Sequence, residues 1–489
     1  MATVETEIRD CRHFIAAEWV DADGGDTFDD LDPFTGDVVA RVAAGGREEA
    51  RRAVEAAAGA FPAWSKAPPA ERQRIFIQAA DALERRRDDV VAWLARETGC
   101  TLGFGMFQMS FVPGLLRQAA ALPYAPIGQI IPSDHGDFAM GLRRPVGVVG
   151  AIAPWNAALI LSARSIAAPL ALGNTVVLKP SELSPYVGGL IWGEIFAEVG
   201  LPAGVLNIVT HAPEHAAEIG EEFVESPHLR CINFTGSTAT GRNLAEAAGR
   251  NLKRVVLELG GYNPLIVLAD ADVEYAVNAA AFGAYLHQGQ ICMSARRIVV
   301  ERPIAGPFVE RLAEKAKGLK AGDPKDPATI IGPLINERAL ETVKTRVEDA
   351  VAKGAKVLAG GEADGAVYRA TLLTDVPEES DFARLETFGP VAAIEVVDDA
   401  DEAVARANAT SYGLASGIIT NDADKGLALA QRIEAGIVHI NDQPVGDEPQ
   451  MPFGGVKESG WGRFGGTAVI EEFTEVHWIT VGRPHPFPF

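Results

Sequence analysis

Short apolar runs alternate with longer amphipathic segments through the middle of the chain. The apolar runs predict strands, and the segments between them, near 157–171, 184–199, 212–222 and 239–249, have the spacing of helices. The expected strands are Val146–Ile152, Thr175–Lys179, Val205–Val209, Arg230–Phe234 and Arg254–Glu258. Strands that are apolar throughout and separated by helices are typical of a parallel sheet buried on both faces.

A second alternating block follows between residues 264 and 441. Asp270-Ala-Asp272 has the short acidic side chains that begin a helix. The expected strands of this block are Leu265–Leu268, Arg297–Val300, Val391–Val397, Gly417–Thr420 and Ile437–Ile440. The first 45 residues have the pattern of short strands, and residues 48–122 that of helices. At 489 residues the chain is too long for one core, so we expect two or three α/β domains.

Charge and cysteine content exclude several classes of function. The net charge of −22 opposes binding to nucleic acid or to an anionic membrane. The four cysteines are scattered without ligand spacing, so we expect no metal site and no disulfide framework. Reduced thiols and an N-terminus without the apolar core of a signal peptide predict a cytoplasmic protein. Residues 145–163 carry no charge, but Pro154 and Asn156 interrupt them, which favours a buried strand entering a helix over a membrane span.

Polar side chains stand where the strands of the first block end. Asn156, Lys179, Ser237 and Glu258 each lie at or just past a predicted strand end. Ligands of open α/β sheets bind at the carboxyl ends of the strands. We therefore expect these four residues to gather around one site.

Three residues have the chemistry needed to react with a carbonyl. Cys292 lies in a small, weakly polar turn and can present its sulfur as a nucleophile. Glu258 ends an apolar strand, where burial raises a carboxyl pKa toward the range of a general base. Asn156 carries an amide that can stabilise an oxyanion. Together they suggest chemistry at a carbonyl carbon.

Seven short motifs occur in order along the chain and resemble the NAD(P)-dependent aldehyde dehydrogenase superfamily. They are Pro154-Trp-Asn156, Lys179-Pro-Ser-Glu182, Phe234-Thr-Gly-Ser237, Glu258-Leu-Gly-Gly261, Gly289-Gln-Ile-Cys292, Glu386-Thr-Phe-Gly-Pro390 and Pro452-Phe-Gly-Gly455. The resemblance implies a Rossmann-like cofactor domain (1–126 and 146–256) and an α/β catalytic domain (257–443). It also implies a small β oligomerisation arm with bridging segments (127–145 and 444–489), and hence a homodimer or homotetramer.

The resemblance also implies roles for individual residues. Cys292 would attack an aldehyde, with the oxyanion held by Asn156 and a backbone N–H, and Glu258 would activate the water that hydrolyses the thioester. Relatives that transfer the acyl group to coenzyme A lack this glutamate, so a free carboxylic acid is the expected product. The cofactor-binding residues would be Trp155, Lys179, Glu182, Gly236, Ser237, Gly241, Leu259, Glu386 and Phe388. The Glu182 carboxylate would repel a 2′-phosphate, which favours NAD, with NADP possible.

The amino-acid sequences of these motifs are most similar to those of benzaldehyde, vanillin and salicylaldehyde dehydrogenases. This resemblance implies an aromatic aldehyde substrate. Phe107, Met109 and Val112 are the candidate pocket residues, since apolar and polarizable side chains suit a flat ring. An aliphatic semialdehyde or betaine-type aldehyde dehydrogenase is an alternative, and a non-catalytic protein on the same scaffold is another. Tyr262 stands where many relatives carry lysine, and the sequence offers no account of it.

Overall fold

The larger sheet contains eight strands and carries the first block of the sequence. In the computed structural model, which describes residues 8–489, the strand order is β24-β12-β11-β8-β9-β10-β2-β3. The central five strands are parallel: β8 (Val148–Ile152), β9 (Thr175–Lys179), β10 (Leu206–Ile208), β11 (Leu229–Thr235) and β12 (Arg254–Glu258). Antiparallel strands close both edges: β2 (His13–Ile15) with β3 (Glu18–Val20), and β24 (Gly460–Trp461).

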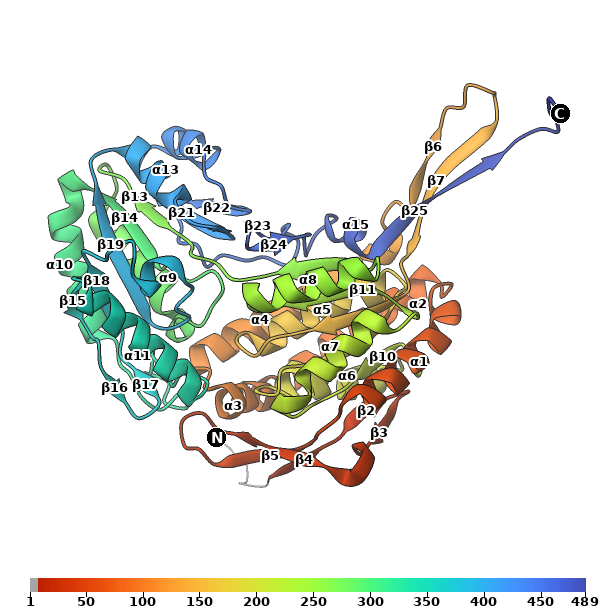
Figure 1. Cartoon of the computed structure of the whole chain (residues 1–489), viewed down its shortest axis with the longest axis horizontal. Coiled ribbons are helices and arrows are strands. Elements are labelled where there is room, and N and C mark those ends of the chain that lie inside the picture. The colour runs from red at the N-terminus through yellow and green to blue at the C-terminus, as the bar shows by residue number, and fades with distance from the viewer. Residues whose placement is uncertain (1–7) are drawn as a thin grey trace.

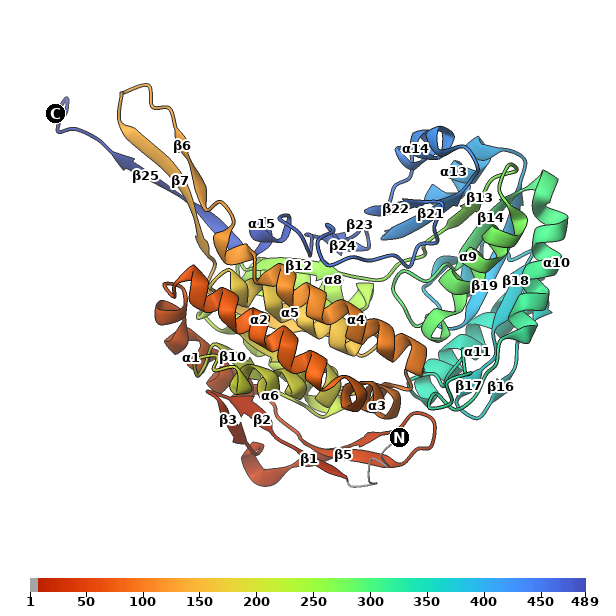
Figure 2. The same cartoon turned by 180° about the vertical axis from the view of Figure 1, so that it is seen from behind.

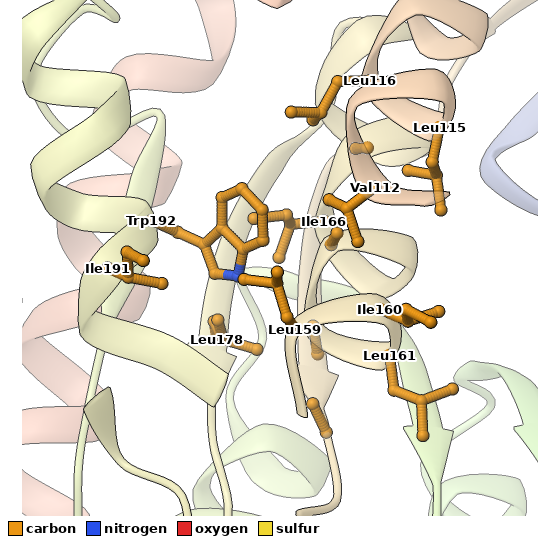
Figure 3. Close-up of a cluster of buried hydrophobic side chains, with 14 of the residues drawn as sticks. Val112, Leu115, Leu116, Leu159, Ile160, Leu161, Ile166, Leu178, Ile191 and Trp192 are labelled. Atoms are coloured by element: carbon orange, nitrogen blue, oxygen red, sulfur yellow. The ribbon is translucent and has the colours of Figure 1, made fainter. Parts of the chain in front are cut away.

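Helices cover both faces of this sheet (Figures 1 and 2). They are α1 (Arg47–Trp64), α2 (Pro69–Arg85), α3 (Arg87–Thr98), α4 (Leu102–Ala119), α5 (Ala158–Ala171), α6 (Ile191–Glu198), α7 (Ala216–Glu225) and α8 (Thr238–Arg250). Helix α5 lies between the sheet and α4, and its apolar sequence is buried almost all round. Figure 3 shows the result, with Val112 of α4, Leu159 of α5 and Trp192 of α6 converging in one core. The only polar atom of the indole is satisfied, because Trp192 Nε1 donates to Ser162 Oγ at 2.7 Å.

The smaller sheet contains seven strands in the order β15-β18-β19-β14-β13-β21-β22. Its strands are β13 (Leu265–Val267), β14 (Arg297–Glu301), β15 (Lys356–Ala359), β18 (Thr371–Thr374), β19 (Val391–Val397), β21 (Ala415–Ile419) and β22 (Ile437–Ile440). Its helices are α9 (Val273–Tyr285), α10 (Arg302–Gly318), α11 (Glu337–Ala352), α12 (Asp381–Arg384), α13 (Ala400–Asn408) and α14 (Ala423–Ala430). The predicted helix start is confirmed, since Asp272 caps α9 by accepting from Tyr275 N at 2.8 Å.

A three-stranded arm projects from the body of the molecule (Figures 1 and 2). Its strands β6 (Gly128–Ile131), β7 (Phe138–Pro145) and β25 (Thr474–Val481) are antiparallel in the order β25-β7-β6. Because β25 comes from the end of the chain, residues more than 300 positions apart form this sheet. Helix α15 (Val469–Phe473) leads into β25.

Small sheets complete the fold. Strands β1 (Arg9–Cys11), β4 (Thr27–Leu31) and β5 (Val38–Ala43) form one near the N-terminus. Two pairs, β16 (Ala363–Asp364) with β17 (Val367–Tyr368) and β20 (Tyr412–Gly413) with β23 (Val456–Lys457), lie beside the second sheet. No helix among residues 8–489 has the length and apolar character needed to cross a bilayer.

The predicted α/β fold is confirmed, and one helix differs in detail. The segment 184–199 begins with a π-helical turn at Tyr186–Leu190 before α6. Within residues 444–489, β23 pairs with β20, β24 extends the larger sheet and β25 joins the arm. The prediction about a signal peptide falls partly on residues 1–7, which lie outside the described residues.

Candidate active site

One cavity of about 450 Å³ brings together strand ends of the larger sheet with α11 and two loops of the second block. All three candidate catalytic residues, Cys292, Glu258 and Asn156, line it. Seven of the candidate cofactor residues also line it: Trp155, Glu182, Gly236, Ser237, Leu259, Glu386 and Phe388. The cavity lies where β8, β9, β11 and β12 end, as expected for an open parallel sheet.

Cys292 is carried by an irregular loop that follows α9. His287 and Gln288 have φ of 50° and 54°, in the left-handed region, so the loop is held by its contacts rather than by local preference. Gln288 Nε2 donates to two backbone carbonyls, Gly99 O at 3.2 Å and Pro333 O at 3.0 Å. The His287 ring stacks on Phe104 with ring centroids 4.4 Å apart. These buried contacts anchor the loop to both halves of the protein.

Asn263 fixes the backbone at the nucleophile itself. Its Nδ2 donates to Cys292 O at 2.6 Å and to Ser294 O at 3.1 Å, and its Oδ1 accepts from Ala415 N at 3.2 Å. Its φ of 46° is a left-handed conformation that asparagine tolerates better than most residues. At Gly261 a Cβ would lie 2.6 Å from Cys292 O, so only glycine lets the two loops approach this closely.

Glu258 is a buried and unpaired carboxyl group. It is 1% exposed, and neither of its carboxylate oxygens has a hydrogen-bond partner among the described residues. Burial raises its pKa to about 8, because desolvation disfavours the charged form. A carboxyl group with a pKa this close to neutrality can both take up and release a proton under ordinary conditions.

Two charged residues next to the cavity act on this carboxyl group in opposite directions. Arg164 of α5 lowers the pKa of Glu258, and Asp447 raises it, although burial has the largest effect. Arg164 and Asp447 form a buried ion pair with Nη2 and Oδ2 2.5 Å apart. The pKa of the Cys292 thiol is raised well above its ordinary value, first by burial and then by the charge of Glu258. The charged form of Glu258 therefore disfavours ionisation of the Cys292 thiol.

Asn156 lies in the loop between β8 and α5 and is 5% exposed. Its Nδ2 donates to Gln290 O at 3.0 Å, which ties it to the loop that carries Cys292. A primary amide has two N–H donors, so a second donor remains for a ligand.

One part of the cavity wall is formed by the start of α8 and by the turn after β9. Ser237 caps α8, accepting from Thr240 N at 3.3 Å, and leaves the first N–H groups of the helix free for an anion. Glu182 contributes a carboxylate to the same cavity. Gly241 does not line it. A Cβ at Gly241 would lie 2.4 Å from Leu259, so this glycine lets Leu259 pack under the helix.

Another part of the wall is formed around Glu386 and Phe388. Glu386 Oε1 accepts from Gly261 N at 3.3 Å and lies 3.8 Å from Nη2 of the fully buried Arg296. The Arg296 guanidinium also lies 5.7 Å from the centre of the Phe388 ring, which meets Trp155 edge-on at 5.6 Å. Burial raises the pKa of Glu386, and the two arginines 296 and 346 lower it.

Lys179 ends β9 as expected but does not line the cavity. Its ammonium group lies 2.5 Å from His211 Nε2, and both side chains are buried. Glu182, which does line the cavity, has Oε2 3.9 Å from the same histidine nitrogen.

A second cavity, of about 760 Å³, lies beside Asp447 and is the candidate substrate side. Of the three pocket candidates, Phe107 lines it, along with Tyr275, Phe282 and Phe453. Met109 and Val112 line neither cavity and are fully buried (Figure 3 shows Val112 within the core). They belong to the same core cluster as Leu159 of α5, and the prediction that they meet the substrate stays a prediction.

Tyr262, whose role the sequence does not explain, is a packing residue. Its hydroxyl donates to Phe382 O at 3.2 Å, and the Arg297 guanidinium lies 4.8 Å from the centre of its ring. It is buried and holds the loop of Asn263 against the second sheet.

Sequence reasoning missed Asn263, Arg296, Arg164 and His211. One signal was available for Arg164, which is the first charge after the long uncharged stretch 145–163 and stands in an otherwise apolar helix. The other three contact residues that are distant in the chain, and their local sequence does not indicate these contacts.

Comparison with known proteins agrees with this arrangement. Residues 19–479 match the aldehyde dehydrogenase family. The chain is 47% identical over 466 residues to a vanillin dehydrogenase of Pseudomonas fluorescens, covering 95% of this chain and 96% of that protein. It is 44% identical to a benzaldehyde dehydrogenase [NAD(+)] of Pseudomonas putida, covering 97% of each. The crystal structure of a salicylaldehyde dehydrogenase from Pseudomonas putida G7, complexed with salicylaldehyde, superposes with a TM-score of 0.96 at 41% identity, covering 98% of this chain and 100% of that one. The chain belongs to the aldehyde dehydrogenase family.

Proposed function

We propose that the protein oxidises an aromatic aldehyde to its carboxylic acid with reduction of NAD. The observation that carries the proposal is the meeting of Cys292, Glu258 and Asn156 in one cavity, with the carboxyl group of Glu258 left unpaired. The names of the similar vanillin, benzaldehyde and salicylaldehyde dehydrogenases support an aromatic substrate.

In this proposal Cys292 is the nucleophile. Its thiol loses a proton, with Glu258 as an acceptor of suitable pKa, and the sulfur adds to the carbonyl carbon. The oxygen becomes an oxyanion, which Asn156 Nδ2 and the backbone N–H of Cys292 stabilise. Glu258 releases this proton to solvent and then takes a proton from water, whose oxygen attacks the thioester carbon. The tetrahedral adduct collapses, and the Cys292 thiolate leaves as the carboxylic acid forms.

The residues present fit a dinucleotide. Free N–H groups at the start of α8 suit a pyrophosphate, and the carboxylates of Glu182 and Glu386 suit ribose hydroxyls. Bound NAD would supply the hydride acceptor that converts the thiohemiacetal on Cys292 to a thioester. Trp155 and Phe388 would pack near its nicotinamide. NADP is the alternative, disfavoured by the negative charge of Glu182.

Phe107, Tyr275, Phe282 and Phe453 support the aromatic assignment, because they line the second cavity together with Asp447, whose charge acts on Glu258. Asp442, Asp447 and Glu448 line it too, so a neutral ring is favoured over one that carries a carboxylate. A betaine-type substrate is the second candidate, because the same acidic lining would attract a cation.

The test is a panel of aldehydes followed by NADH absorbance. Benzaldehyde, vanillin and salicylaldehyde are compared with hexanal, succinic semialdehyde and betaine aldehyde, each with NAD and with NADP. The proposal expects the highest kcat/KM for an aromatic aldehyde with NAD, and the matching acid as product. Higher kcat/KM for hexanal or betaine aldehyde would contradict the aromatic assignment, and a protein inactive on all six would contradict catalysis.

We also propose that the protein is a cytoplasmic homo-oligomer. The arm exposes large apolar side chains on both of its outer strands, with Ile130 72% and Trp478 75% accessible. Apolar side chains on a projecting sheet are stabilised when a second copy of the chain covers them. A cytoplasmic location keeps Cys292 reduced, as its role as nucleophile requires.

A further inference from the structure

Arg296 carries a buried guanidinium group that lies between the nucleophile loop and Glu386. It directly precedes β14, and its backbone carbonyl accepts from Ala393 N of β19 at 2.9 Å, so the smaller sheet fixes its position. Its side chain is 1% exposed. Nη2 donates to Gly289 O at 3.4 Å and lies 3.8 Å from Glu386 Oε1. One nitrogen therefore faces both the loop that carries Cys292 and a carboxylate that lines the cavity.

Stability does not explain the burial of this cation. A guanidinium group stays charged in a protein interior, and a buried charge is costly unless it is paired and hydrogen-bonded. Among residues 8–489, Arg296 Nε and Nη1 have no hydrogen-bond partner, and Glu386 is the only carboxylate within ion-pair distance. Apolar side chains of similar volume are often as good or better at such positions. The role of Arg296 therefore lies in its effect on Glu386.

The Glu386 carboxylate is held in one orientation and in its charged form. Oε1 accepts from Gly261 N at 3.3 Å, and Oε2 packs so closely on Gly260 that a Cβ there would lie 2.3 Å away. Burial raises the pKa of Glu386, and the largest opposing effect is the charge of Arg296, ahead of the Gly261 hydrogen bond and the charge of Arg346. Arg296 thus favours the ionised carboxylate, which is the stronger hydrogen-bond acceptor.

We propose that Arg296 is a positioning residue for the dinucleotide, which holds Glu386 as a fixed, ionised acceptor for the hydroxyls of the nicotinamide ribose. The inference deepens the proposed function and rests on it. Without Arg296, Glu386 is protonated more readily, and a neutral carboxyl group binds ribose hydroxyls less tightly. The loss concerns the nicotinamide half of the dinucleotide and leaves the adenosine half unaffected.

The test measures binding without turnover. Isothermal titration calorimetry gives Kd for NAD, for ADP-ribose and for AMP with the full-length wild type and Arg296→Met. ADP-ribose keeps the second ribose but lacks nicotinamide, and AMP lacks both. We expect Arg296→Met to raise Kd for NAD and for ADP-ribose by about tenfold, the effect of one charge-assisted hydrogen bond, and to leave Kd for AMP unchanged.

Two further variants separate the charge from the packing of this side chain. Arg296→Lys keeps a positive charge next to Glu386 and should recover most of the wild-type affinity for NAD. Arg297→Met is the matched control, because Arg297 is also buried but its Nη1 donates to Arg406 O at 2.7 Å, away from the cavity. It should leave the ratio of Kd for NAD to Kd for AMP as in wild type.

A double variant shows whether Arg296 acts through Glu386. If it does, Arg296→Met combined with Glu386→Gln binds NAD no more weakly than Glu386→Gln alone. Additive losses in the double variant, or an unchanged ratio of Kd for NAD to Kd for AMP in Arg296→Met, would overturn the inference while leaving the proposed function intact. A folded wild type that bound neither NAD nor AMP would contradict the proposed function and the inference together.

Discussion

Arg164 Nη2 lies 2.5 Å from Asp447 Oδ2, and both side chains are buried beside the reactive residues. The guanidinium also lies 4.3 Å from the centre of the Phe453 ring. Since Asp447 and Phe453 line the second cavity, and both charges act on Glu258, the pair connects the candidate substrate side to the base.

We predict that the two members of this pair shift the pKa of Glu258 in opposite directions. Arg164→Met removes a positive charge, so the pKa rises and the increase of kcat with pH moves to higher pH. Asp447→Asn removes a negative charge, so the pKa falls and the same limb moves to lower pH. The pH dependence of kcat measures the pKa of Glu258 in both variants. A pKa that moves in the same direction in Arg164→Met and Asp447→Asn would rule out this electrostatic account.

The pair also contributes to stability. Removal of either partner leaves an unpaired buried charge, so each single variant should lose about 3–5 kcal/mol of unfolding free energy. Arg250→Met is the matched control, because its ion pair with Glu246 is exposed and is worth less than about 1 kcal/mol. Urea denaturation of the three variants checks the difference, and equal losses in Arg164→Met and Arg250→Met would show that the buried pair contributes nothing special.

Glu258→Gln should lower activity and raise stability. Loss of the base lowers kcat by about 10²–10⁴-fold. The folded-state pKa of Glu258, about 8, lies above its ordinary value of 4.5, so the folded protein binds the proton more tightly and loses stability as pH rises from 4.5 to 8. The neutral glutamine does not ionise, so at pH 8 the variant should be more stable than wild type by about 4 kcal/mol.

Thermal or urea unfolding at two pH values checks the direction of this change in stability with pH. The stability advantage of Glu258→Gln should be present at pH 8 and absent near pH 4.5. A variant less stable than wild type at pH 8 would contradict the assignment of Glu258 as a buried, unpaired acid.

Gly261→Ala should disrupt the nucleophile loop. The added Cβ would lie 2.6 Å from Cys292 O and 2.5 Å from Asn263 Oδ1, so the loop must move. We expect a loss of kcat of about 10²-fold, the size of effect that a 1 Å displacement of a reacting group produces. Gly249→Ala is the control, because a Cβ there meets nothing within 4 Å in α8 and should raise stability slightly. Similar kcat values in the two variants would show that the close approach at Gly261 is not required.

Much of the fold follows from sequence pattern, because period and length determine which segments form strands and helices. Strands β9, β12, β19 and β22 begin and end where the apolar runs do. The arm was expected only from the resemblance, since β7 and β25 pair across more than 300 residues and neither shows its partner in its own sequence.

Some residues of the candidate site could likewise be predicted from the sequence, and others could not. The sequence around Glu258 predicts that it ends an apolar strand, and its burial could be predicted from that position. The sequence does not decide which side of α4 Met109 and Val112 face, because apolar residues lie all along this helix. The contact of Asn263 with Cys292 depends on two loops packing together, which no local pattern records.

A second copy of the chain should cover the arm. Trp478→Glu places a charge on the most exposed aromatic of β25 and should lower the assembly state, as measured by size-exclusion chromatography with light scattering. Leu252→Glu is the control, because Leu252 is even more exposed than Trp478 but lies outside the arm. An unchanged mass for Trp478→Glu would contradict the proposed role of this surface.

The most direct test of the account compares NADH formation from benzaldehyde and NAD by wild type, Cys292→Ala and Cys231→Ala. Cys231 is buried in β11, and burial raises its pKa to about 12, so it serves as a matched inert thiol. The account predicts turnover by wild type and Cys231→Ala, and no turnover by a folded Cys292→Ala that still binds NAD. Turnover by Cys292→Ala at the wild-type rate would contradict the account.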